Sequence, residues 1–209
     1  MKSWNTVTVL GRPRRQQVVR VALAAGLLAV VLWVLPTRKA GEQGGHHGEH
    51  VRLDAFERAG LVELKDRHRT PPLRLPRLDG GVTALADHGD KLVVVNFWAT
   101  WCQPCTLEMP TLEALWREYR ERGLVVLGVS MDRGAPRALL DPYVRRLELS
   151  FPILLDADLA ASQAWRVASL PATFVVRPGG NAVALAFGAR EWNSDEMRAV
   201  LESLLPARP

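Results

Sequence analysis

The sequence predicts an α/β fold, with a central mixed β-sheet flanked by helices on both faces, behind an N-terminal transmembrane helix. Two observations predict the α/β part. β-branched apolar runs such as "LVVVNF" alternate with segments of helical apolar spacing, and the chain closes with a hairpin and a helix. The third observation is an unbroken stretch of apolar residues at positions 21–35, which predicts the membrane helix.

The charge is unevenly distributed along the chain. Of 27 basic and 22 acidic residues, the first 40 positions hold seven basic residues and no acidic one, which leaves 20 basic and 22 acidic residues for positions 41–209. The seven are Lys2, Arg12, Arg14, Arg15, Arg20, Arg38 and Lys39. The net positive charge therefore belongs to the N-terminal arm, and we expect no nucleic acid among the partners.

A helix over the apolar stretch and its flanks, residues 18–36, is about 28 Å long at 1.5 Å per residue, which matches the hydrocarbon core of a bilayer. The alternative is a cleaved signal peptide, but no small-x-small site follows, because Arg38 lies third before a break after Ala40. More positive charge precedes the stretch than follows it, so residues 1–17 are predicted to stay cytoplasmic and the remainder to be exported.

Residues 37–70 are predicted to be a flexible linker, because positions 37–50 are rich in glycine and polar side chains. Positions 51–65 leave open a short helix followed by an extended piece. His46, His47, Glu49 and His50 carry the ligand types of a copper, nickel or zinc site. A solvated linker without metal is the alternative, because glycines leave these side chains unorganised.

The elements of the exported domain follow in order. A hairpin turn between extended segments is predicted at Asp79, Gly80 and Gly81. A strand buried on both faces is predicted at residues 92–97. Helical spacing runs to Gly123, a second buried strand follows at 124–130, and a helix with a break at Pro142 comes next. A short strand and a helix over 151–165, a hairpin turning at 178–181 and a final helix capped by Asn193 complete the domain.

The two cysteines of the chain, Cys102 and Cys105, form a C-x-x-C pair directly after the first buried strand. Pro104 suits the first turn of a helix, so Cys102 is expected at a helix N-terminus, where backbone donors and the helix dipole favour the thiolate. Cys102 would attack a partner disulfide and Cys105, one turn further in, would resolve the mixed disulfide. Trp98 and Trp101 are expected to pack around the pair. A structural zinc site is disfavoured, because it needs two more ligands at suitable spacing, and we predict no metal here.

The stretch "VVVNFWATWCQPCTLEMP" resembles the active-site segment of thioredoxin-like proteins, in particular the membrane-anchored TlpA/ResA/DsbE-type thiol-disulfide oxidoreductases of bacteria. The resemblance extends over about residues 71–205, so we place a thioredoxin-like domain at 71–209. It implies a redox-active disulfide of Cys102 and Cys105 and no other cofactor.

The resemblance also assigns residues around the pair. Pro171 matches the proline that follows a cis peptide and faces the disulfide, and the backbone of Ser169 and Leu170 would offer an edge to an extended partner segment. Glu108 matches a glutamate near the pair that accepts protons, although a simple helix charge is the alternative. The partner-binding residues implied are Trp98, Trp101, Gln103, Pro104, Ser169 and Leu170.

Three residues depart from the family pattern. Asn96 stands where many thioredoxins have an acidic residue, which leaves Glu108 as the candidate proton acceptor. Ser169 replaces a frequent glycine and Arg177 a frequent aspartate, and both departures bear on the shape of the partner groove.

The function expected is a thiol-disulfide oxidoreductase that reduces disulfides of exported proteins. It is expected in the bacterial inner membrane, with one transmembrane pass and its C-terminal domain in the periplasm. The resemblance implies clients with oxidised cysteine pairs, such as apocytochrome c or copper-centre proteins, and electrons from a membrane thiol reductant carrier. A monomer is expected. Two alternatives remain open: an oxidant that donates its disulfide, and a metal-delivery module that uses the His-rich linker.

Overall fold

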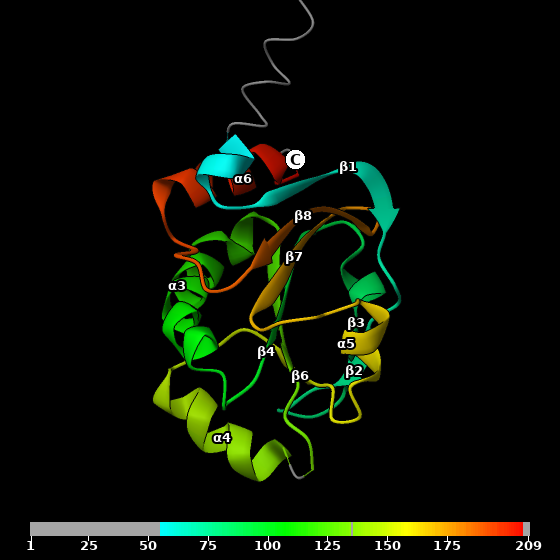
Figure 1. Cartoon of the computed structure of the whole chain (residues 1–209), viewed down its shortest axis with the longest axis vertical. Coiled ribbons are helices and arrows are strands. Elements are labelled where there is room, and N and C mark those ends of the chain that lie inside the picture. Colours follow the sequence, from blue (N-terminus) through cyan, green and yellow to red (C-terminus); the bar gives the residue numbers. More distant parts are fainter. Residues whose placement is uncertain (1–54, 135, 207–209) are drawn as a thin grey trace, which may run out of the picture. The chain divides into compact units, whose positions relative to one another are not determined.

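The computed structural model describes residues 55–134 and 136–206. Six strands form one mixed sheet in the order β1-β8-β7-β4-β5-β6, and β2 and β3 form a separate hairpin (Figure 1). The strands are β1 (Val62–Arg69), β2 (Arg74–Pro76), β3 (Val82–Ala84), β4 (Leu92–Trp98), β5 (Leu124–Ser130), β6 (Ile153–Leu155), β7 (Ala172–Arg177) and β8 (Asn181–Phe187). The labelled α-helices are α3 (Gln103–Tyr119), α4 (Pro136–Arg146), α5 (Ala160–Ala164) and α6 (Asp195–Leu204), with 3-10 turns η1 (Leu85–His88) and η2 (Arg120–Arg122). Residues 55–58 are also helical.

The centre of the sheet consists of the two apolar runs that the sequence analysis identified. β4 and β5 pair in parallel, and every residue of both strands is buried. β7 pairs antiparallel with β4, so the sheet is mixed as predicted. A strand buried on both faces needs cover from two layers, which is why these runs show no polar alternation.

Two apolar clusters cover the two faces of the sheet. The first contains buried side chains of α3, α4 and α6, among them Met109, Leu140 and Val200. The second contains buried side chains of α5 and of the segments around β3, among them Trp165 and Leu85. Helices therefore lie on both faces, which confirms the predicted layer arrangement.

The structure corrects three expectations. The flexible linker predicted for 37–70 is wrong for 55–58, which are helical, and for 62–69, which form β1 and pair antiparallel with β8. The short helix and extended piece left open for 51–65 are thus both present in the described part of that range. The cap of the last helix is Ser194 rather than Asn193, since the Ser194 side chain accepts a hydrogen bond from the Met197 backbone. Helix α4 shows no break at Pro142 and continues through it.

The other elements lie where they were predicted. The hairpin of β2 and β3 turns at residues 77–81, and the hairpin of β7 and β8 turns at 178–180. Within the described ranges no helix is long and apolar enough to cross a membrane. The predicted transmembrane helix over 18–36 and the cytoplasmic segment 1–17 lie outside the described residues.

Candidate active site

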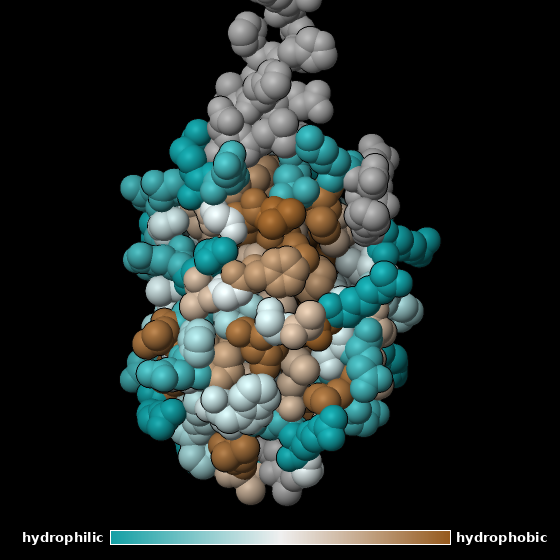
Figure 2. Space-filling view, in the orientation of Figure 1, coloured by the Kyte–Doolittle hydropathy of each residue, from teal (hydrophilic) through white to brown (hydrophobic). Residues whose placement is uncertain are grey.

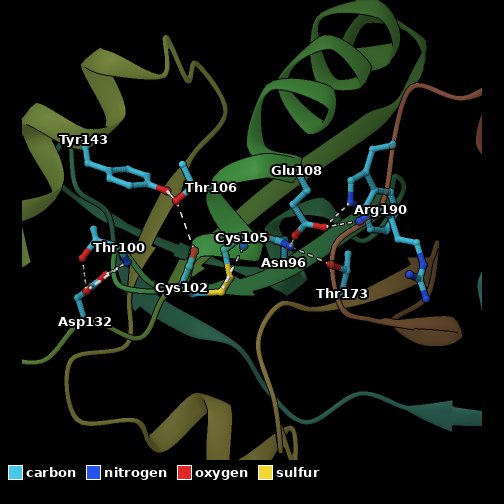
Figure 3. The surroundings of a disulfide bond; sticks show 11 residues. Asn96, Thr100, Cys102, Cys105, Thr106, Glu108, Asp132, Tyr143, Thr173 and Arg190 are labelled. Atoms are coloured by element: carbon cyan, nitrogen blue, oxygen red, sulfur yellow. Dashed lines mark hydrogen bonds between the residues drawn. A yellow bond between two sulfur atoms is a disulfide. The ribbon is translucent and has the colours of Figure 1, made fainter.

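The two cysteines form a disulfide at the N-terminus of α3 (Figure 3), with an S–S distance of 2.02 Å. Cys102 is the cap residue of the helix, and its Sγ accepts a hydrogen bond of 3.3 Å from the backbone N–H of Cys105. Cys102 is 6% exposed and Cys105 is 0% exposed. Cys102 is therefore the more accessible of the two sulfur atoms, and its role as the attacking cysteine stays a prediction.

Asp132 anchors the loop that leads into the cysteine pair. Its carboxylate accepts hydrogen bonds from the backbone N–H and the hydroxyl of Thr100, at 3.1 and 2.7 Å, and from the hydroxyl of Ser130 at 2.9 Å. Asp132 is buried and follows the end of β5, next to the end of β4. A charged carboxylate with three donors holds this loop more firmly than neutral contacts would.

Glu108 lies one turn beyond Cys105 and is 1% exposed. Its carboxylate accepts hydrogen bonds from Asn96 Nδ2 (2.8 Å), the Arg190 backbone N–H (3.0 Å) and Trp192 Nε1 (3.1 Å). Asn96 Nδ2 also donates to the Thr173 hydroxyl at 2.8 Å, so these residues share one buried network (Figure 3).

The environment of Glu108 changes its acidity. Burial raises the pKa of its carboxyl above the ordinary value of 4.5, and the hydrogen bonds from Trp192, Asn96 and Arg190 oppose this shift only in part. A buried carboxyl of raised pKa can hold a proton where a surface glutamate would have lost it. This is the property expected of a proton acceptor and donor beside a thiol pair.

Trp98 is the one predicted partner-binding residue whose placement excludes that role. Its side chain is 0% exposed and stacks on Tyr143, with ring centroids 5.1 Å apart. The Tyr143 hydroxyl lies 2.7 Å from the Thr106 hydroxyl, which donates to the backbone carbonyl of Cys102 at 3.4 Å. Trp98 thus supports the redox loop from within the core and does not contact a partner.

An open groove of about 490 Å³ lies beside Cys102. It is lined by Trp101, Cys102, Gln103, Pro104, Met131, Val167, Ala168, Ser169 and Leu170. The peptide bond between Leu170 and Pro171 is cis, as predicted. Five predicted partner-binding residues therefore meet at one groove with Cys102, the more accessible of the two cysteines. Trp101 is 70% exposed there.

The sequence analysis missed several residues of this region. Met131, Val167 and Ala168 line the groove, and Asp132, Tyr143 and Trp192 support its surroundings. Met131 and Asp132 follow directly after a predicted strand that neighbours the cysteine strand, and this position at a strand end was the available signal. Tyr143 and Trp192 come from distant elements and carry no local motif.

The described residues contain no group of three or more histidine, cysteine, aspartate or glutamate side chains that could hold a metal ion. His46, His47, Glu49 and His50, the candidate metal ligands of the linker, lie outside the described ranges. The Cys102–Cys105 disulfide is the candidate reactive group that the described residues place at the site.

Comparisons with known proteins agree with this geometry. A sequence profile of the AhpC/TSA family matches residues 67–184. The thiol-disulfide oxidoreductase ResA of Geobacillus thermodenitrificans is 32% identical over 136 residues, which cover 65% of this chain and 76% of the relative. ResA of Oceanobacillus iheyensis is 30% identical over 129 residues, which cover 62% of this chain and 65% of the relative.

A solved structure supports the fold. The thiol:disulfide interchange protein of the thioredoxin family from Chlorobium tepidum superposes with a TM-score of 0.59 at 23% identity, covering 68% of this chain and 99% of that chain. The predicted thioredoxin-like fold is therefore confirmed for the described domain.

Proposed function

From the premise that this chain belongs to the AhpC/TSA family of thioredoxin-like proteins and is a thiol-disulfide oxidoreductase, we propose that it reduces disulfides of exported client proteins. In the proposed reaction the reduced Cys102 and Cys105 pass two electrons to a client cysteine pair and become the disulfide seen in the structure.

The charge around Cys102 supports the reductive direction. No Lys, Arg or His is among the residues that line the groove at Cys102, so within the described part of the chain no cation faces the thiol there. Two buried carboxyl groups, Glu108 and Asp132, flank the redox loop instead (Figure 3). A dithiol oxidises others strongly when its thiolate form is stabilised. Here the N-terminus of α3 favours the thiolate and the groove lining adds no cation, which supports a reductant.

The proposed reaction has two exchange steps. The Cys102 thiolate attacks one sulfur of the client disulfide, an S–S bond forms between the two proteins, and the other client sulfur leaves as a thiolate. Cys105 then loses its proton and attacks Cys102 Sγ, which releases the second client thiolate and closes the Cys102–Cys105 disulfide. Glu108 is the proposed acceptor of the Cys105 proton, because it is a buried carboxyl one turn beyond Cys105 and burial raises its pKa above the ordinary value.

The groove provides for client binding. The backbone of Ser169 and Leu170 precedes the cis peptide and offers hydrogen-bonding groups to an extended client segment, as in strand addition. Phe187, 48% exposed, pairs with Ala172 directly after Pro171, and apolar surface extends from there over β7 and β8 (Figure 2). We propose that apolar side chains near the client cysteines rest on this surface.

The proposal places the domain in the periplasm, held at the inner membrane by residues 18–36. Clients such as apocytochrome c before haem attachment, or copper-centre proteins, follow from the resemblance to ResA-type proteins. A membrane thiol reductant carrier would return the disulfide to the dithiol. The protein would act as a monomer, since one chain supplies both cysteines and the groove.

The reduction potential of the Cys102/Cys105 couple tests the direction. The full-length protein is equilibrated with glutathione or dithiothreitol buffers, and the fraction of dithiol is measured by thiol alkylation. We expect a potential below about −220 mV, in the range of thioredoxin and the more reducing glutaredoxins. A potential near about −120 mV would make the protein an oxidant and reject the reductase proposal.

Two single variants test the order of attack. Cys102→Ser is expected to abolish insulin reduction, because the accessible nucleophile is lost, whereas Cys105→Ser is expected to accumulate a mixed disulfide through Cys102. Reductase activity retained in Cys102→Ser would contradict the mechanism.

A further inference from the structure

A second hollow, here called the arginine-rimmed pocket, lies between the β1–β2 connection, η1 and the turn of β7 and β8. It encloses about 510 Å³, a size typical of sites for small molecules. It shares no lining residue with the groove at Cys102. Val93 at the start of β4 lines the pocket, and the cysteines follow the other end of that strand, roughly 17 Å further along at about 3.3 Å per residue.

The pocket combines an apolar floor with a basic rim. Its floor contains four buried side chains, Leu73, Leu85, Val93 and Val176. Three arginines also line it, namely Arg69, Arg74 and Arg177, together with His88.

Among the residues whose side chains the structure describes, the arginines of the rim form no ion pair with a carboxylate. None of the lining residues is Asp or Glu. Asp87, the carboxylate next to His88 in the sequence, does not line the pocket and accepts a hydrogen bond of 2.8 Å from the Ala84 backbone. The guanidinium groups are thus available to an external anion, for which arginine offers paired donors.

Backbone hydrogen bonds hold the walls of the pocket in place. The N–H of Thr70 donates to Gly180 at 3.1 Å, the N–H of Leu85 donates to Leu73 at 2.9 Å, and the N–H of Gly179 donates to Gly89 at 2.9 Å. These bonds join segments that are far apart in the sequence. A ligand would therefore meet a preformed cavity and would not have to order its walls.

We propose that the arginine-rimmed pocket binds an organic anion with a compact apolar body, whose carboxylate or phosphate meets the arginines while the body rests on the apolar floor. This site is separate from the disulfide and does not depend on the proposed reductase function. The same chemistry is found in soluble organic acids and in anionic lipids, and the experiment distinguishes the two sources.

The test uses the full-length protein in phosphatidylcholine nanodiscs, titrated with 2-naphthoate as the anionic probe and 2-naphthamide as its neutral match. We expect saturable binding of 2-naphthoate that Arg74→Gln together with Arg177→Gln weakens at least tenfold. Arg58→Gln, which removes an exposed arginine that does not line the pocket, is the matched control and should bind like the wild type. Ala86→Phe, at an exposed lining position, should abolish binding by filling the space.

Three results would overturn the proposal: no binding of 2-naphthoate to the wild type, equal affinity for 2-naphthamide, or an equal loss in Arg58→Gln. A second set of nanodiscs contains phosphatidylglycerol. If 2-naphthoate binds equally well in these nanodiscs, the pocket is assigned to soluble anions. If phosphatidylglycerol competes with 2-naphthoate, and Arg74→Gln with Arg177→Gln abolishes this competition, the pocket is assigned to an anionic lipid headgroup. Thiol-disulfide exchange is measured in parallel for the wild type and each variant. A variant that loses 2-naphthoate binding but keeps thiol-disulfide exchange shows that the two proposals succeed or fail independently.

Discussion

Glu108 accepts hydrogen bonds from three donors and is nearly out of contact with water, and these two properties have opposite effects on its charge. Burial is the larger effect, so the carboxyl is more basic in the folded protein than in the unfolded chain. The folded state is therefore favoured while Glu108 is protonated, and it loses this advantage as the pH rises from about 4.5 through the raised pKa.

This pH dependence predicts the behaviour of Glu108→Gln. At low pH the variant should be less stable by about 1–3 kcal/mol, because the glutamine amide cannot accept hydrogen bonds from all three donors. As the pH rises above about 4.5, the wild type alone acquires a buried charge, so the stability difference should shift in favour of the variant. Urea unfolding at a series of pH values measures this difference. Glu57→Gln, at an exposed position, is the control and should show no such shift. A constant difference for Glu108→Gln would disprove the assignment.

Asp132 is a positioning residue for the redox loop, and its charge lies on the side of the loop opposite Glu108 in Figure 3. Asp132→Asn keeps an acceptor for Thr100 but removes the negative charge. We expect a loss of about 1–3 kcal/mol in stability, together with a less negative reduction potential for the cysteine pair, because the thiolate is then less disfavoured. The reduction potential distinguishes an electrostatic effect of Asp132 on the cysteines from simple support of the fold.

Asp90→Asn, at an exposed position, is the control and should leave the reduction potential of the cysteine pair unaltered. An unaltered reduction potential in Asp132→Asn would contradict the electrostatic effect.

At the scale of elements, β5 can approach Trp98 closely because Gly128 has no side chain. A Cβ at this position would lie 2.8 Å from Phe151, 3.1 Å from Ile153 and 3.2 Å from Trp98 Nε1. Trp98 in turn stacks on Tyr143, so a shift of its ring would be transmitted toward the cysteine loop.

Gly128→Ala should therefore destabilise the protein by about 1–3 kcal/mol through overpacking. For a domain of this size the melting temperature should fall by roughly 2–4 °C for each kcal/mol. Gly89→Ala is the control, since the nearest atom to its new Cβ lies at an ordinary 3.5 Å. Equal melting temperatures for wild type and Gly128→Ala would show that β5 has room for a methyl group.

An element could be predicted from the sequence when its own residues determine its conformation, and it was missed when contacts with distant residues determine it. β4 and β5 were predicted because their own residues are apolar without alternation. β1 was missed because "VELKDRHR" is strongly charged, and its strand conformation depends on pairing with β8, more than a hundred residues away. Helix α4 continues through Pro142 because the neighbouring Leu140 and Tyr143 are buried, and tertiary packing offsets the local cost.

The same reasoning applies to the site. The sequence predicted three site residues because they lie in recognisable short motifs, namely Cys102, Cys105 and Pro171. The structure brings them to one end of the sheet. Trp98 was misassigned because an aromatic residue beside a motif fits both a core and a surface position. Asp132 carries no motif, and its role becomes visible only when β5 is placed next to β4.

For the whole molecule, the proposed membrane attachment rests on residues 18–36. The full-length protein produced in a bacterium should remain with the membrane fraction after an alkaline carbonate wash, because an apolar helix of this length stays inserted. A chain that starts at residue 41 should be released to the soluble fraction. Recovery of the full-length protein among soluble proteins would reject the anchor and support a cleaved signal peptide.

The two edges of the main sheet are β1 and β6. β1 carries many charged residues, and β6 has only three residues, which the neighbouring hairpin partly covers through the N–H of Leu78 donating to Ile153 at 2.8 Å and a bridge between Arg77 and Leu154. Charged and short edge strands do not template pairing with another sheet. Both edges of the main sheet are therefore protected against pairing with the sheet of a neighbouring molecule. If residues 18–36 hold the chain in a membrane as proposed, this protection has added weight, because proteins in one membrane plane meet often and in similar orientations.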